Sequence, residues 1–285
     1  MPELPEVQTV VDNLNKLKIV GDIIGDAKVF WPRTIADPAP AVFCRNIKGH
    51  TIQQITRRGK YIVMVLSQNL TLLIHLRMTG HLNWEHRDKP RNKHEHVILE
   101  MGGNMELRFQ DTRKFGRIFL TSKPRAILGK IGPEPLANDF TLARFHKILT
   151  TCRRQIKPLL LDQKRIAGLG NIYVDEALWK AGIHPLRISC TLSKKEISAL
   201  HRAIPHVLRT GLRNMGTTLG GGAGNFYSVA GRRGRNADQL KVFRRDGQAC
   251  PRCGNSIERI VVGQRGSHIC PKCQRKPSSL SLSRA

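Results

Sequence analysis

The sequence predicts an α+β protein of several domains, and three observations lead to this prediction. Apolar residues recur at helical spacing in residues 6–17, and short apolar or alternating runs then follow as far as residue 121. Four cysteines near the C-terminus have the spacing of metal ligands. The length of 285 residues is enough for about two domains with cores of their own.

The first 121 residues are expected to form a leading helix followed by a β-sandwich or a β-barrel. The helix is predicted because Val7, Val10, Val11 and Leu14 fall on one helical face. Turn formers separate the apolar runs that follow, which is typical of antiparallel strands. The expected strands are residues 61–66, 71–76, 97–101, 105–109 and 117–121.

The chain becomes helical after the breaker cluster at residues 132–135, a predicted linker. Helices are expected after a cap at Asp139 or Thr141, from Lys157, at 174–179, and from a capping box at 193–196 to about residue 214. The Gly- and Arg-rich residues 216–236 are predicted to form a mobile loop. We therefore divide the chain into an N-terminal domain of one helix and β-strands (1–131), a helical domain that ends in the Gly- and Arg-rich segment (132–236), a small cysteine-containing module (237–275) and a disordered tail (276–285).

The charge of the chain indicates a polyanionic partner. There are 48 Lys and Arg residues against 21 Asp and Glu, which gives a net charge of +27. The basic residues are spread along the chain and are not gathered in a tail, so they favour a long nucleic-acid-binding surface. The sequence has no apolar run of membrane-spanning length, and its acidic, Pro-rich start is unlike a signal peptide. We expect a cytoplasmic protein.

Cys250 and Cys253 form one CxxC pair, and Cys270 and Cys273 form a second pair 16 residues further on. This spacing predicts one tetrahedral, four-thiolate zinc site of the closed, structural kind. Residues 263–266 between the pairs are expected at the tip of a hairpin that presents Arg265. Zinc ribbons also mediate protein contacts, so the zinc site alone does not establish DNA binding.

The start of the chain carries the strongest chemical signal. Removal of Met1 would leave Pro2 as a secondary amine at the chain terminus, and an α-amino group has a pKa near 8, well below that of lysine. Such an amine can attack an aldehyde carbon and form an iminium ion. Glu3 and Glu6, three residues apart, are expected on one helical face. Proline and acids are also ordinary features of a helix N-terminus.

Several other segments are candidate DNA contacts, each with a plainer structural interpretation. Met78, before Thr79-Gly80, suits a loop tip that enters a base stack, although it could belong to the core. Arg113 and Phe115 are expected on the same side of an extended segment, where they suit invasion of a duplex. The start of the helix at Asn171, after Gly168-Leu-Gly170, is a candidate phosphate site. Lys60 could be a solvated edge lysine, and His94-Glu-His96 is a weak metal signal that better fits a phosphate contact or a surface role.

Taken together, these strings resemble the bacterial formamidopyrimidine-DNA glycosylase family over residues 1–275. The similar strings are MPELPE at the start, RRGK around Lys60, HLRMTG around Met78, His94-x-His96, DTRKFG around Arg113, GPEPL at 132–136, GLGNIY around Asn171, MGTT at 215–218 and the four-cysteine module with Gln264-Arg265-Gly266.

The resemblance implies a bifunctional base-excision repair enzyme with a β-sandwich, a helix–two-turns–helix domain and a zinc finger. It implies that the enzyme removes oxidised purines (8-oxoguanine and formamidopyrimidines) from duplex DNA and cleaves the abasic strand by β,δ-elimination through a Schiff base. By this resemblance the nucleophile is Pro2, the general acid/base is Glu3, and Glu6 supports the site. The implied phosphate contacts are Lys60, His94, Asn171 and Arg265, of which Lys60 and Arg265 also donate protons; the implied intercalating residues are Met78, Arg113 and Phe115; and Lys157 is implied near the lesion phosphates.

Two alternatives stay open on the sequence. One is an enzyme similar to endonuclease VIII, which prefers oxidised pyrimidines; the other is a non-catalytic DNA-binding protein on the same scaffold. Gln8 stands where the family commonly has Glu, and we expect little effect because it should point away from the face of Glu6. Residues 219–224 are Gly-rich in the region that the family uses to cover 8-oxoguanine. The expected protein is a bacterial, nucleoid-associated monomer that binds double-stranded DNA and one structural Zn²⁺.

Overall fold

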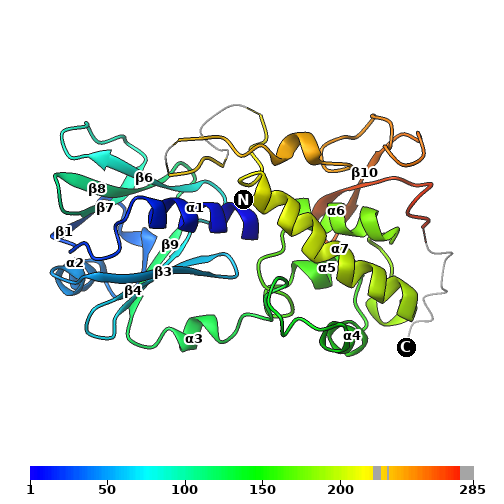
Figure 1. The fold of residues 1–285 in the computed structure, drawn as a ribbon, viewed down its shortest axis with the longest axis horizontal. Coiled ribbons are helices and arrows are strands. Elements are labelled where there is room, and N and C mark those ends of the chain that lie inside the picture. The colour runs from blue at the N-terminus through cyan, green and yellow to red at the C-terminus, as the bar shows by residue number, and fades with distance from the viewer. Residues whose placement is uncertain (221–225, 230, 277–285) are drawn as a thin grey trace. The chain divides into compact units, whose positions relative to one another are not determined.

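The computed structural model describes residues 1–220, 226–229 and 231–276 (Figure 1). Most of the Gly-rich segment and the predicted disordered tail from residue 277 therefore lie outside the described residues. The chain divides into two compact units, and each unit combines two separate stretches of sequence. The first unit is Met1–Lys130 with Gly211–Ala237, and the second is Ile131–Thr210 with Asp238–Ala285.

The first unit is a β-sandwich, which settles the choice between sandwich and barrel. One sheet has the strand order β1-β7-β8-β6 and is antiparallel; the other has the order β2-β9-β5-β4-β3, in which only β2 and β9 pair in parallel. The strands are β1 (Asp26–Val29), β2 (Ile35–Asp37), β3 (Ile52–Arg58), β4 (Tyr61–Leu66), β5 (Thr71–His75), β6 (Gly80–His86), β7 (Glu95–Glu100), β8 (Met105–Asp111) and β9 (Arg117–Thr121).

The sandwich core lies between the two sheets and is closed by two helices. Leu72 and Ile118 from one sheet and Leu107 from the other belong to one buried apolar cluster. The predicted leading helix is α1 (Leu4–Lys16), and its apolar stripe, including Val10 and Leu14, is buried in the same cluster. The shorter helices of this unit are α2 (Pro40–Ile47), η1 (Pro32–Thr34) and α3 (Arg125–Leu128).

Residues 211–237 return to the first unit after the helical part of the chain. Phe226 and Val229 are buried in the sandwich core cluster. Isolated bridges pair Thr217 with Arg235 and Tyr227 with Arg233. The prediction of a mobile loop over 216–236 is therefore wrong for the parts of this segment that the structure describes, because two apolar side chains and backbone bridges anchor them.

The second unit contains the predicted helices and the zinc hairpin. Its helices are α4 (Leu142–Thr150), α5 (Ile156–Leu161), α6 (Asn171–Ala181) and α7 (Lys194–Arg213, whose last turn belongs to the first unit), with η2 (Ser189–Thr191) and η3 (Asn236–Gln239). Thr141 caps α4 through its hydroxyl, which accepts a hydrogen bond from the Arg144 backbone N–H. Ser193 and Glu196 form the predicted capping box of α7.

The strands that the sequence pattern did not identify are β1, β2, β3 and β6, and every one of them lies at the edge of a sheet. β1 and β2 each bury one residue and β3 buries two of its seven, so no apolar or alternating run marks these three strands. No helix of the described residues is long and apolar enough to cross a membrane.

Candidate functional site

The start of α1 holds two buried carboxylates. Glu3 is the N-cap residue and is 2% exposed, and Glu6 is 1% exposed. The backbone N–H of Glu3 donates a hydrogen bond to Glu6 Oε2 at 2.8 Å. This bond fixes the peptide that joins Pro2, which is itself buried, to Glu3. The structure thus brings these three predicted residues together.

The second oxygen of Glu6 binds a segment far along the chain. Glu6 Oε1 accepts a hydrogen bond from the Thr217 backbone N–H at 2.7 Å. Gly216 has φ +80°, and a Cβ added there would lie 2.9 Å from Glu6 Cγ, so the close approach requires glycine. Glu6 therefore joins the start of α1 to residues 216–217.

Lys60 lies in the turn between β3 and β4 and is 4% exposed. The interpretation of Lys60 as a solvated edge lysine is therefore wrong. The same hairpin is tied to α1, because Arg57 Nε donates a hydrogen bond to Gln8 Oε1 at 3.0 Å and Arg57 also binds the Gly59 carbonyl at 2.9 Å. Gln8, expected to have little effect, thus contacts the arm that carries Lys60.

His75 is a buried histidine at the end of β5, the strand that pairs with β4. His75 is 7% exposed, and its Nδ1 accepts a hydrogen bond from the Arg77 backbone N–H at 3.0 Å. Burial, with the nearby charges of Arg77 and Lys60, lowers the pKa of His75 to about 3. His75 is therefore neutral near pH 7.

Met78, Arg113 and Phe115 lie on two turns of the first unit. Met78 is half-buried in the turn between β5 and β6, whereas Arg113 and Phe115 are exposed in the turn between β8 and β9. The Arg113 guanidinium lies 4.8 Å from the centre of the Phe115 ring. The prediction that they share one side holds, but the segment is not extended, because Lys114 between them has φ +59°.

Asp111, at the end of β8, connects these turns. Its carboxylate accepts hydrogen bonds from the Thr79 hydroxyl, from the Arg113 N–H at 3.2 Å and from the Gly116 N–H at 2.7 Å. Asp111 is 0% exposed. Asp111 and Thr79 belong to the sequence motifs, but the motifs did not predict their role; an acid that ends a strand directly before a turn was the available signal.

His94 is half-buried and also contacts Asp111. The His94 carbonyl accepts a hydrogen bond from the Asp111 N–H at 2.9 Å. His96 is buried, and its Nε2 lies 2.8 Å from the Asp111 carbonyl oxygen. Among the described residues, the only group suited to a metal ion is the four-cysteine cluster. Among these described residues, neither histidine therefore belongs to a metal-binding group, and the His96 side chain contacts the Asp111 backbone.

In the second unit, Lys157 is fully buried. Its Nζ donates hydrogen bonds to Asp175 Oδ1 at 2.6 Å and to the Gly266 carbonyl at 3.0 Å. Asp175 Oδ2 in turn accepts the His268 N–H at 2.9 Å. The ammonium group of Lys157, which the resemblance implies near the lesion phosphates, thus connects helix α6 to the zinc hairpin.

Asn171 and Arg265 are linked through the same hairpin. The strands β10 (Glu258–Val262) and β11 (Arg265–Ile269) form the hairpin, and Arg265 is exposed next to its tip, as predicted. Asn171 is the first residue of α6, and its Nδ2 donates a hydrogen bond to the Gly266 carbonyl at 2.9 Å. Arg265 therefore lies next to the residue that both Asn171 and Lys157 bind.

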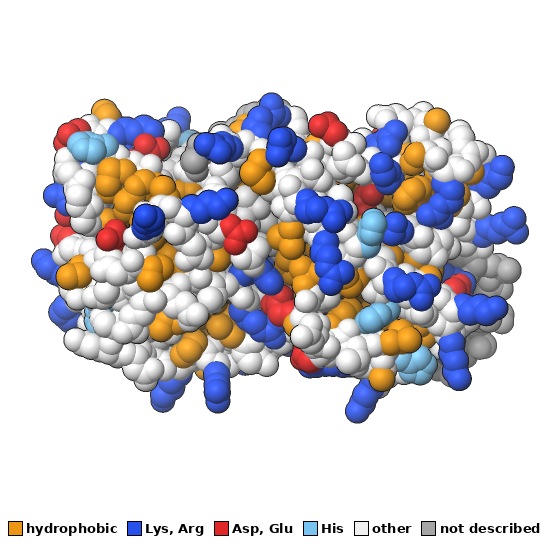
Figure 2. Space-filling view, in the orientation of Figure 1, with side chains coloured by type: hydrophobic (Ala, Val, Ile, Leu, Met, Phe, Trp, Pro, Cys, Tyr) orange, Lys and Arg blue, Asp and Glu red, His pale blue; other side chains and the backbone are white. Residues whose placement is uncertain are grey.

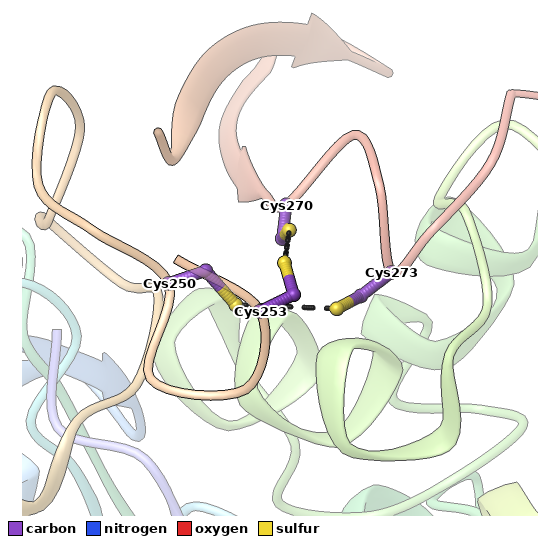
Figure 3. Close-up of side chains that lie close together, drawn as sticks. All are labelled: Cys250, Cys253, Cys270 and Cys273. Carbon is purple, nitrogen blue, oxygen red and sulfur yellow. Dashed lines mark hydrogen bonds between the residues drawn. The ribbon is translucent and has the colours of Figure 1, made fainter. Parts of the chain in front are cut away.

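The four cysteines fit one zinc ion. Their sulfur atoms all lie within 4.8 Å of one another, with Cys253 and Cys270 at 3.4 Å and Cys250 and Cys273 at 4.0 Å (Figure 3). Tetrahedral coordination with Zn–S bonds of about 2.3 Å places sulfur atoms about 3.8 Å apart. Trp179 Nε1 on α6 also donates a hydrogen bond to Cys250 Sγ at 3.4 Å.

Basic side chains cover much of the visible surface of both units, whereas acidic side chains are few (Figure 2). This distribution agrees with the net charge of +27 and with a polyanionic partner.

Three family models match consecutive parts of the chain. The formamidopyrimidine-DNA glycosylase N-terminal domain matches residues 1–118, the formamidopyrimidine-DNA glycosylase H2TH domain matches 131–221, and the zinc finger found in FPG and IleRS matches 247–275. They support the predicted sandwich, helix–two-turns–helix and zinc-finger architecture. The exact domain boundaries stay a prediction.

Whole proteins are similar over nearly the same length. The formamidopyrimidine-DNA glycosylase of Protochlamydia amoebophila is 44% identical, covering 90% of this chain and 93% of its own. A crystal structure of a Lactococcus lactis FPG mutant with DNA containing Fapy-dG has a TM-score of 0.90 and 38% identity, covering 96% of this chain and 100% of that one. A structure of MutM with DNA containing carbocyclic 8-oxo-G has a TM-score of 0.88, with 38% identity and the same coverage.

Proposed function

The chain belongs to the formamidopyrimidine-DNA glycosylase family, and from this premise we propose how its residues excise oxidised purines from duplex DNA and cleave the resulting strand. It is a bifunctional enzyme of base-excision repair, a DNA glycosylase and an abasic-site lyase. The relatives crystallised with Fapy-dG and 8-oxo-G DNA support the purine substrates.

Catalysis begins at Pro2. After Met1 is removed, the Pro2 nitrogen attacks C1′ of the damaged nucleotide; the base leaves and an iminium ion forms. The positive charge acidifies the C2′ proton, so that loss of this proton expels the 3′ phosphate. A second elimination expels the 5′ phosphate. A zinc ion held by the four cysteines would stabilise the fold of the hairpin that carries Arg265.

The carboxylates next to Pro2 are proposed to move protons and to hold the site. Glu3 is the general acid/base that aids ring opening, because it adjoins the amine in sequence and its backbone is fixed. Glu6 supports the site through its bonds to Glu3 and Thr217. Lys60 and Arg265 are assigned as phosphate ligands and as proton donors to the two elimination steps.

The remaining residues are proposed to bind DNA. His94 and Asn171 complete the phosphate contacts, and Met78, Arg113 and Phe115 fill the gap that a flipped nucleotide leaves in the duplex. Lys157 contributes to DNA binding indirectly, because its buried ammonium group holds the Gly266 carbonyl beside Arg265.

The observation that carries the proposal is the buried Pro2–Glu3 segment, whose backbone Glu6 fixes. Borohydride trapping on an 8-oxoguanine duplex tests it, because borohydride reduces the iminium ion to a stable covalent adduct. Mass spectrometry should place the adduct on residue 2. An adduct on a lysine, or no adduct despite base release, would contradict the assignment.

The alternative preference for oxidised pyrimidines is separable by one comparison. Excision of 8-oxoguanine opposite cytosine should be faster than excision of thymine glycol from a matched duplex. The reverse order would place the chain with enzymes similar to endonuclease VIII.

A further inference from the structure

We propose that Asp111 and Thr79 are positioning residues that hold the Met78 turn and the Arg113–Phe115 turn together as one DNA-probing element. This inference rests on the proposed function, in which these turns enter the duplex. Neither residue touches the reacting atoms; both act through the side chains that the turns carry.

The hydrogen bonds form a closed set between the two turns. The Thr79 hydroxyl donates to Asp111 Oδ1 and accepts from the Arg113 N–H at 3.1 Å, while Asp111 Oδ1 also accepts from that N–H at 3.2 Å. Asp111 Oδ2 binds the Gly116 N–H at the other end of the turn at 2.7 Å. One carboxylate and one hydroxyl thus fix the position of both turns.

The side chains at the centre of this set are shielded from water. Asp111 is 0% exposed and Thr79 is 7% exposed, so water does not compete for these hydrogen bonds. A buried carboxylate is costly unless donors surround it, and here two backbone N–H groups and one hydroxyl do so. The shielded, charge-assisted bonds make the link between the turns stiff.

The backbone needs such a link. Arg77 has φ +54° and Lys114 has φ +59°, and neither is a glycine. Left-handed backbone is unfavourable for non-glycine residues, so the turns relax to other conformations unless the surroundings hold them. Removing the hydroxyl should therefore let Met78 and the Arg113–Phe115 pair move independently.

The link also reaches His94, the proposed phosphate ligand that directly precedes β7. The Asp111 N–H binds the His94 carbonyl at 2.9 Å, so the residue that sets the two turns also sets the backbone of His94. The positions of four residues proposed to contact DNA therefore depend on the buried Asp111: Met78, His94, Arg113 and Phe115.

The test compares Thr79→Val with Thr79→Ser in the full-length, zinc-loaded enzyme. Two substrates are used: an 8-oxoguanine duplex, which must be invaded, and a single-stranded abasic oligonucleotide, which has no base stack to fill. Thr79→Val should lower kcat/KM for the duplex by about 10- to 100-fold, because one charge-assisted hydrogen bond is lost. Cleavage of the single strand should stay close to the parent, and Thr79→Ser should restore duplex activity.

A double-mutant cycle tests the coupling itself. Met78→Ala should lower duplex excision strongly in the parent but much less in the Thr79→Val background, because the Met78 side chain is already misplaced in that background. Thr121→Val is the matched control, since its hydroxyl also accepts a backbone N–H bond, from Lys123, at the far end of β9. Thr121→Val should leave both activities unchanged.

The outcomes are distinct. Equal losses on both substrates, together with a lower melting temperature, would make Thr79 a folding element and overturn the inference. Duplex excision by Thr79→Val at the parental rate would overturn it as well. If the parent itself forms no borohydride adduct, the proposed function fails, and this inference fails with it.

Discussion

At the scale of single residues, the proposed catalysis depends on the burial and the hydrogen bonds of the ionisable groups at the start of α1 and beside Lys60. Glu3 and Glu6 are both buried, and the Glu6 carboxylate accepts hydrogen bonds from the backbone N–H groups of Glu3 and Thr217, which fixes Glu6 and the backbone of Glu3. A fixed carboxylate next to a nucleophile needs no reorganisation when charge develops in the transition state.

Replacing the first two residues of the processed chain separates binding from chemistry. Pro2→Gly retains a primary amine but should lose most of the excision activity. Glu3→Gln should bind lesion DNA like the parent but lower base release by about 10²- to 10⁴-fold, the usual contribution of a general acid or base. Single-turnover assays and filter binding measure the two effects. Normal excision by Glu3→Gln would remove Glu3 from the mechanism, and an uncleaved N-terminal extension should abolish the adduct.

His75 should make the fold sensitive to acid. Its pKa is about 3 in the folded protein and near 6.5 when unfolded, so between these values the unfolded chain binds one more proton. Stability should then fall by about 1.4 kcal/mol per pH unit as pH drops below 6.5. In urea unfolding, the free energy of unfolding of His75→Gln should fall less between pH 6.5 and 4.5 than that of the parent. The exposed-site control His86→Gln should follow the parent; a variant slope equal to the parent's would refute the claim.

At the scale of elements, short turns and one hairpin present the proposed DNA contacts, while sheets and helices hold them. The β8–β9 turn folds tightly over the core, because a Cβ on Gly116 would lie 2.3 Å from the Phe109 ring and 3.2 Å from Asp111 Oδ2. The zinc hairpin is held from α6 by Asn171, Asp175 and Trp179.

Gly116→Ala should therefore destabilise the first unit. The added methyl group must displace a fully buried ring, which typically costs about 1–3 kcal/mol. The control is Gly102→Ala, where a Cβ would meet nothing within 4 Å. Urea denaturation should show a lower midpoint for Gly116→Ala and almost none of this loss for Gly102→Ala. Equal midpoints would show that the ring moves aside freely.

Zinc should control DNA binding through the hairpin. Chelation, or Cys253→Ser, should unfold the hairpin and withdraw Arg265 from the DNA. Arg265→Ala should retain the zinc but weaken lesion-DNA binding by about 10- to 100-fold, the value of one charged hydrogen bond. Zinc content and binding are measured together, with Cys190→Ser as a control at an exposed cysteine outside the cluster. Parental cleavage by Cys253→Ser would show that the module is dispensable.

At the scale of the whole molecule, charge governs association. With a net charge of +27, binding should weaken steeply as salt is raised, because each phosphate contact releases counterions. A plot of log K against log salt should have a slope of about −0.9 per phosphate contact on duplex DNA. Arg265→Ala should reduce the slope by about one contact. Binding that ignores salt would contradict the role given to the basic surface.

The sequence predicted the central strands because their patterns are strongly apolar, as in β4 and β5, whose neighbours on both sides are strands. It missed the four edge strands, of which β1, β2 and β3 bury only one or two residues each and so carry no apolar run. At the site, motifs identified the chemical groups but not their surroundings. The burial of Lys60 and Lys157, and the bonds from Asp111, depend on partners distant in sequence, which no local spacing encodes.

Because each compact unit combines two stretches of the chain, a chain whose synthesis stops early lacks part of both units. A ribosome that stops after residue 210 releases a sandwich without Phe226, Val229 and the Thr217 partner of Glu6. The same fragment leaves the Asp175 and Glu176 carboxylates of α6 without the backbone donors that residues 241–268 supply. Neither unit is complete until the last quarter of the chain emerges. We therefore expect a chain that ends at residue 210 to be cut faster than the full chain in limited proteolysis.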